Sequence, residues 1–200
     1  MGQILRDVLF EAIFWFELLA AVLLFARFLA KRDSYWRRFP WAAVCCVAAI
    51  PVTYVTHAMQ FGYVLLTCLA ALLVWFLCDI SWQDSLYCAI CAYATQHFGY
   101  ALNPLIFPPD TGWGFFGLHS ILIQAAVYAA VYYLVAKPLP NSGRYGVTVS
   151  YSLISAVMFF AFATVLWGSG AGHSISVSAP SLRVRYIYDL FCCVFFLWVQ

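Results

Sequence analysis

The stretch VLFEAIFWFELLAAVLLFARFLA, residues 8–30, decides the fold class, because it is an almost unbroken run of apolar side chains. One crossing of a bilayer needs about 20 such residues, and this run is too long for the apolar core of a signal peptide. It also contains two acidic residues, Glu11 and Glu17. We therefore expect a retained helix that crosses a membrane.

The composition extends this expectation to the whole chain of 200 residues, of which 66% are hydrophobic and 9% are charged. Soluble domains carry roughly a quarter charged residues. Backbone groups without partners are costly in hydrocarbon, and the runs lack the alternation of barrel strands, so each crossing should be a helix. We predict an all-α, polytopic integral membrane protein, one domain over residues 1–200, with about seven transmembrane helices at residues 8–30, 40–56, 62–80, 85–107, 117–136, 147–167 and 186–200.

The charges predict the orientation in the plasma membrane. Short cytoplasmic loops retain Lys and Arg. Two connections carry most of the basic residues, and they would lie on the cytoplasmic side with the N-terminus outside and the C-terminus cytoplasmic: Arg27, Lys31, Arg32, Arg37, Arg38, Lys137 and Arg144. The net charge of +2 offers no basic surface for nucleic acid.

The last apolar run, residues 186–200, would span only about 22 Å of a hydrocarbon core roughly 30 Å thick. It also lacks a basic or aromatic flank at its end. This predicts that the chain is the membrane part of a longer protein, with the domain that it controls downstream of residue 200.

All eight cysteines fall in apolar segments, which is typical of small buried residues rather than of a disulfide framework. Cys88 and Cys91 form a CxxC pattern, but no second pair or nearby histidine set completes a zinc site. We expect no metal and no cofactor.

Two short motifs resemble active-site sequences without their context. A GxGxxG at residues 112–117 follows no strand, and its bulky aromatic neighbours favour an outer loop at the membrane interface. The run GSGAGH at residues 168–173 lacks the frame of GxSxG, and its small residues favour a flexible outer loop. No catalytic motif is found within residues 1–200.

Ionisable residues inside a bilayer are functional candidates by default, and Glu11, Glu17 and His97 are in such positions. Glu11 lies near the outer end, whereas Glu17 is deeper and needs an internal partner. The two carboxylates lie about 120° apart on a helix and do not form an acid–base pair. Two interpretations stay open for Glu17, a hydrogen bond to another helix or the sensing of a ligand or proton.

The segment 85–107 is the most polar of the seven. Tyr93, Gln96, Tyr100 and Asn103 recur at spacings of three and four and share one face, which cannot point at lipid. This face either joins the bundle through hydrogen bonds between helices or lines a cavity. His97 lies beside it, as a titrating group or as a packing residue. Asp84 before Ser85 predicts the start of this helix.

The runs WQDSLY (residues 82–87) and AYATQHFGY (residues 92–100), with the basic first loop and the multi-span layout, resemble the membrane region of bacterial sensor histidine kinases with a GHKL-type ATPase domain. These are relatives of the accessory-gene-regulator receptor kinases. The resemblance implies a homodimeric receptor of a two-component system, whose outer face senses a ligand, in the relatives often a peptide. Kinase activity would reside downstream, so no catalytic residue is carried over.

We therefore expect a membrane-embedded sensing module that transmits binding of an extracellular ligand to a cytoplasmic kinase domain. The ligand would meet the loops 108–120 and 168–185 and the polar helix. The candidate sensing residues are Glu17, Tyr93, Gln96, His97, Tyr100, Asn103, Trp113, His119, His173, Arg183 and Arg185. The alternatives are a small transporter with residues 85–107 as its path, although no internal repeat is visible, and an intramembrane peptidase.

Overall fold

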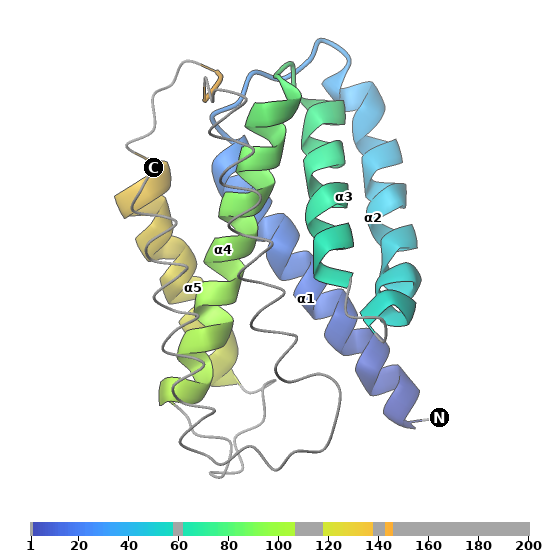
Figure 1. The fold of residues 1–200 in the computed structure, drawn as a ribbon, viewed down its shortest axis with the longest axis vertical. Coiled ribbons are helices and arrows are strands. Elements are labelled where there is room, and N and C mark those ends of the chain that lie inside the picture. Colours follow the sequence, from blue (N-terminus) through green and yellow to red (C-terminus); the bar gives the residue numbers. More distant parts are fainter. Residues whose placement is uncertain (1, 58–61, 107–117, 138–142, 146–200) are drawn as a thin grey trace.

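The computed structural model describes residues 2–57, 62–106, 118–137 and 143–145. This part of the chain is all-α, as predicted (Figure 1). Its elements are α1 (Gly2–Ala26), α2 (Tyr35–His57), α3 (Gly62–Leu77), α4 (Trp82–Ile106), α5 (Leu118–Val131) and the π-helical turn η2 (Tyr132–Ala136). The predicted helices at 147–167 and 186–200 lie outside the described residues.

Helix α4 is the centre of the arrangement and packs against α1, α3 and α5. The helices α2, α3 and α4 run side by side, and α1 crosses behind them obliquely (Figure 1). From Cys88 to Gln96 every residue of α4 is buried. Because neighbours surround this helix, its polar side chains must find partners within the bundle.

The first helix begins at Gly2 and not at the predicted residue 8, and it ends at Ala26, earlier than the predicted residue 30. Its end has a tertiary reason. The backbone N–H of Ala30 donates to the Gly143 carbonyl at 2.9 Å, and the Ala30 carbonyl accepts from the Asp79 N–H at 2.8 Å. Both backbone groups of Ala30 are thus used by segments distant in sequence, so they are not available to continue the helix.

The second helix begins at Tyr35 and not at residue 40, so Pro40 lies inside the helix. The third ends at Leu77 and not at residue 80. Two arginines from the first loop satisfy carbonyls at this end: Arg32 Nε donates to Cys78 O at 2.8 Å, and Arg38 Nη1 donates to Phe76 O at 2.9 Å. Cations at a helix C-terminus also complement its dipole.

The fourth helix begins at Trp82, three residues before the predicted start. Ser81 Oγ accepts a hydrogen bond from the Asp84 backbone N–H at 3.1 Å, which is the geometry of an N-cap residue. Asp84 therefore lies inside the first turn, where its charge still favours the positive end of the helix dipole.

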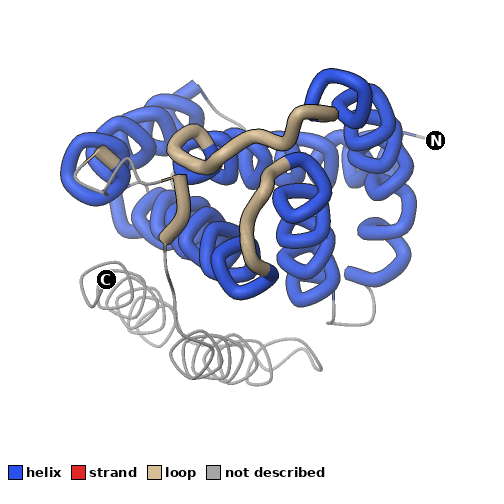
Figure 2. The backbone as a smooth tube through the Cα atoms, turned by 90° about the horizontal axis from the view of Figure 1, so that it is seen from above, coloured by secondary structure: helices blue, strands red, loops and turns tan. Residues whose placement is uncertain are grey.

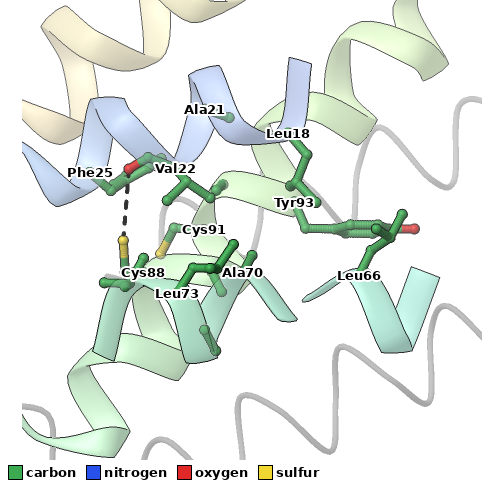
Figure 3. Packing of buried hydrophobic residues seen from close by; sticks show 14 of the residues in the cluster. Leu18, Ala21, Val22, Phe25, Leu66, Ala70, Leu73, Cys88, Cys91 and Tyr93 are labelled. Atoms are coloured by element: carbon green, nitrogen blue, oxygen red, sulfur yellow. Dashed lines mark hydrogen bonds between the residues drawn. The ribbon is translucent and has the colours of Figure 1, made fainter. Parts of the chain in front are cut away.

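Small side chains let α1, α3 and α4 approach closely. Ala21 from α1, Ala70 from α3 and Cys91 from α4 are fully buried at the contact. In Figure 3 the Cys88 thiol of α4 is directed at the Val22 carbonyl of α1, at 3.9 Å. The cysteines of this region thus pack as small apolar residues.

The surface of the bundle is rich in large apolar side chains, whereas its interior holds several polar ones. The exposed apolar side chains include Phe16, Leu23, Trp41, Val44, Val47, Leu72, Ile121, Leu122 and Leu134. The buried polar side chains are Thr67, Asp84, Ser85, Thr95, Gln96, Asn103, His119 and Gln124. By length and composition, one helical stretch of the described residues, His119–Ala136, is suited to cross a membrane; Ala12–Ala26 and Leu65–Leu77 are shorter apolar helices.

Candidate functional site

The polar residues of α4 meet α1 at Glu17, which lies in the middle of its helix and is partly buried. Tyr100 donates its phenolic O–H to Glu17 Oε2 at 2.8 Å. Tyr128 from α5 donates to the Glu17 backbone carbonyl at 2.7 Å. One residue of α1 is thereby hydrogen-bonded to both α4 and α5.

One turn before Tyr100 on α4, Gln96 makes a second link to α1. Its amide Nε2 donates to the Phe14 carbonyl at 2.6 Å, and its amide group also interacts with the Glu17 carboxylate. The Phe14 and Tyr100 rings pack at a centroid distance of 5.4 Å. Water does not reach this buried amide, so the Phe14 carbonyl takes the place of a water molecule as its hydrogen-bond acceptor.

Gln124 from α5 completes the cluster. Its Nε2 donates to the Gln96 backbone carbonyl at 3.2 Å. Its side chain lies directly over Gly99, where a Cβ would be only 2.6 Å from Gln124 Cδ. The absence of a side chain at position 99 therefore allows α5 to place this amide against α4. We call Glu17, Gln96, Tyr100, Gln124 and Tyr128 the polar junction.

Further along α4, Asn103 is buried and donates from Nδ2 to Ser120 Oγ of α5 at 3.4 Å. The adjacent His119 is also buried. Within the described residues, two buried amide oxygens of α4 accept no hydrogen bond: Gln96 Oε1 and Asn103 Oδ1. Both can accept a further donor.

Tyr93 and His97 form a separate pair. Their rings stack with centroids 5.3 Å apart and an interplanar angle of 15°. Tyr93 is buried beside Leu66 of α3, as Figure 3 shows, whereas His97 is partly exposed. The predicted polar face thus divides: Gln96, Tyr100 and Asn103 bond to α1 and α5, and Tyr93 packs toward α3.

Other predicted candidates fall elsewhere. Trp113, His173, Arg183 and Arg185 lie outside the described residues, as do the motifs at 112–117 and 168–173. The side chain of Glu11 is also outside them. No group of three or more potential metal-ligating side chains occurs in the part of the chain that the structure describes.

The sequence interpretation missed Gln124 and Tyr128, although both interrupt the apolar segment 117–136 at a spacing of four. Polar residues on one face of an apolar helix indicate contacts with neighbouring helices, and this signal could have found them. The role of Gly99 depends on the position of α5 and has no local signal.

Tyr145 makes a contact with α1 near the C-terminal end of that helix. Its hydroxyl donates to the Phe25 carbonyl at 2.6 Å. Burial raises the pKa of the Tyr145 phenol above its usual range, with nearby Cys88 adding to the effect. Burial also raises the pKa of Tyr35, in the first turn of α2. Both phenols therefore stay neutral and able to donate at physiological pH.

The polar junction can act chemically as a set of hydrogen-bond donors and acceptors around one carboxylate. It contains no nucleophile–base pair. Its residues are instead suited to hold three helices in one arrangement. No family model, no curated protein and no solved structure matches this chain.

Proposed function

We propose that this chain is the membrane-embedded sensing module of a two-component receptor kinase in the plasma membrane. It would cross the bilayer several times, form a homodimer and pass the binding of an extracellular ligand, with a peptide as the first candidate, to a cytoplasmic kinase domain. The observation that carries this proposal is the polar junction, in which Glu17 is hydrogen-bonded to Tyr100 of α4 and, through its backbone carbonyl, to Tyr128 of α5.

The distribution of side chains supports a location in the membrane. Exposed Leu, Val, Ile, Phe and Trp side chains suit contact with lipid tails, and buried amides and hydroxyls suit the bonds that join helices where water is absent. Thr95, for example, is fully buried and donates to the Cys91 carbonyl one turn earlier at 2.8 Å. Hydrocarbon solvent favours this arrangement of polar and apolar groups.

The charge distribution supports the proposed orientation. The backbone bridge between Leu29 and Gly143 and the bridge between Lys31 and Cys78 bring the basic connections to one end of the bundle (Figure 2). Arg27 to Arg38, Lys137 and Arg144 therefore lie at the same end. A shared cytoplasmic side requires this placement.

The junction also supplies a means of transmission. A ligand changes the output only if it binds one helix arrangement more strongly than another. The bonds of Tyr100 and Tyr128 to α1 are few and specific, so a shift of α1 along α4 would break them together. Ligand binding at the outer end of the helices would then move the cytoplasmic ends.

The unoccupied acceptors Gln96 Oε1 and Asn103 Oδ1 favour a second candidate, a small transporter whose substrate donates hydrogen bonds along α4. The alternative of an intramembrane peptidase receives no comparable support from the described residues.

The coding sequence beyond Gln200 separates these functions. An open frame that continues into a helix with a phospho-acceptor histidine and then an ATPase domain is the expected result. A stop codon directly after Gln200 would contradict the receptor-kinase proposal and favour the transporter. In the expected case, autophosphorylation of the full-length receptor in vesicles should change when Glu17→Gln is introduced.

A further inference from the structure

The basic end of the bundle contains two structurally distinct kinds of cation. Arg32 and Arg38 are partly buried and bond to carbonyls at the end of α3. The remaining five are exposed: Arg27, Lys31, Arg37, Lys137 and Arg144. Of these, Arg27 Nη1 donates to the Tyr132 hydroxyl at 3.0 Å. The first two bond to the end of α3, and we call the exposed five the outer cations; Lys31 and Arg37 lie beside the start of α2.

Aromatic rings hold several of the outer cations. Lys31 Nζ lies 5.0 Å from the centroid of the Tyr35 ring. Lys137 Nζ lies 5.4 Å from the Tyr133 ring, and the Arg27 guanidinium lies 5.8 Å from the Tyr132 ring. Contacts of this kind fix the direction of a charge without neutralising it.

Large aromatic side chains surround these charges at the start of α2. Trp36 is 76% exposed, Trp41 is 69% exposed and Phe39 is 45% exposed. Exposed tryptophans beside basic residues are typical of the level of the lipid headgroups. Arg37 lies between them in sequence and is itself exposed.

Acidic residues are too few to neutralise the positive charge at this end of the described bundle. Asp84 is buried in the first turn of α4, and only Asp33 and Asp79 are exposed among the acidic residues of these connections. The surface thus combines an excess of positive charge with rings that favour the membrane interface. Its chemistry is complementary to a lipid that carries a negative headgroup.

We propose that the outer cations bind the headgroups of anionic phospholipids, with Lys31 and Arg37 next to Trp36 as the principal contacts. This inference rests on the proposed location in the membrane. The occupant is a lipid because the tryptophans beside the charges would insert at the headgroup level, which a soluble anion does not require. Bound lipid would anchor the first connection and the start of α2 at the cytoplasmic leaflet.

The test uses the full chain purified in a neutral detergent, with phosphatidylglycerol or phosphatidylcholine of identical acyl chains added. Native mass spectrometry counts the retained lipids, and a thermal unfolding curve gives the stability in each lipid. We expect phosphatidylglycerol to be retained preferentially and to raise the unfolding temperature more than phosphatidylcholine does.

Two variants separate binding from folding. The double variant Lys31→Gln and Arg37→Gln should lose at least half of the preference for phosphatidylglycerol and keep its unfolding temperature in phosphatidylcholine. The control variant Arg38→Gln should lower the unfolding temperature equally in both lipids and keep the preference. If the double variant fails to fold, Arg37→Gln alone provides the same comparison.

Several results would overturn the proposal. Equal retention of both lipids by the unmodified chain would do so, as would an unchanged preference in the double variant. An equal rise in unfolding temperature with soluble glycerol phosphate would indicate a site for a free anion instead. Alkaline carbonate extraction of the chain from membranes separates the failures: a chain released by carbonate refutes the membrane proposal itself, whereas a retained chain without lipid preference refutes only this inference.

Discussion

At the scale of single residues, Glu17 is the position where charge and hydrogen bonding can be separated. Tyr100 donates to its carboxylate, and a glutamine at position 17 can accept the same bond through its amide oxygen. The free energy of unfolding of Glu17→Gln should therefore lie within about 1 kcal/mol of that of the unmodified chain. Glu17→Ala removes this acceptor of the tyrosine, so its free energy of unfolding should be lower by about 1–3 kcal/mol. Thermal unfolding in detergent measures both.

The variants Glu17→Gln and Glu17→Ala also test the sensing hypothesis. If Glu17 senses a ligand or proton, Glu17→Gln changes the kinase output of the full-length receptor although the fold is intact. Unchanged output in Glu17→Gln, together with the loss of stability in Glu17→Ala, would leave Glu17 as a residue that only joins helices.

His97 stacks on the buried Tyr93 ring and is itself partly exposed. We expect His97→Ala to alter the response to ligand without preventing membrane insertion. His97→Phe is the control, because it keeps an aromatic ring against Tyr93 and removes the titratable group. Failure of His97→Ala to insert, with normal insertion and response of His97→Phe, would instead identify a packing residue.

Gly99 is a residue whose importance comes from its neighbour. A methyl group at this position would overlap the Gln124 side chain, so Gly99→Ala must displace that amide from the Gln96 carbonyl. The lost hydrogen bond should lower the free energy of unfolding by about 1 kcal/mol or more.

A double-mutant cycle checks this cause, since Gln124→Ala removes the overlapping side chain. In that background Gly99→Ala should cost much less than in the unmodified chain. Equal costs in both backgrounds would show that Gln124 is not the obstacle.

At the scale of elements, the start of α4 depends on one hydroxyl. Ser81 caps the helix by accepting from the Asp84 N–H, and loss of such a cap costs about 1 kcal/mol. Ser81→Ala should lower stability by about this amount, while Ser81→Asp should restore most of it because aspartate is also a good cap. Thermal unfolding of the three chains is the measurement, and equal values for all three would contradict the role of the cap.

The elements also show why sequence boundaries were displaced. Apolar runs predicted the five helices of the described region but not their exact bounds, because burial or lipid contact requires apolar side chains along the length of a helix. Their ends depended on partners elsewhere: Gly143 bonds to Ala30 after α1, and Arg32 bonds to Cys78 after α3. Such partners are separated from these ends by many residues, and no local pattern reveals them.

At the scale of the whole molecule, the basic connections lie together at one end of the bundle, as the bridges at Leu29 and Lys31 show. If this end is cytoplasmic, a cysteine introduced at Ser34 should react with a membrane-impermeant maleimide only after cells are opened. A cysteine introduced at Gly2 should react in intact cells. The unmodified chain, with its own eight cysteines, is the control.

Labelling of the Ser34 position in intact cells would invert the proposed orientation. Labelling of both positions only in opened cells would place the two ends of α1 on the same side, which contradicts a crossing by this helix.

By itself the sequence determined that the described part of the chain is helical and that Glu17, Gln96, Tyr100 and Asn103 need partners, because composition and periodicity report how much apolar surface each segment must bury. Only the tertiary structure decided which partners these are. Tyr100 reaches Glu17 across 83 positions and Tyr128 across 111. Bonds over such separations depend on how the helices cross, and crossing geometry is set by the packing of small residues such as Ala70 and Cys91 rather than by any local signal.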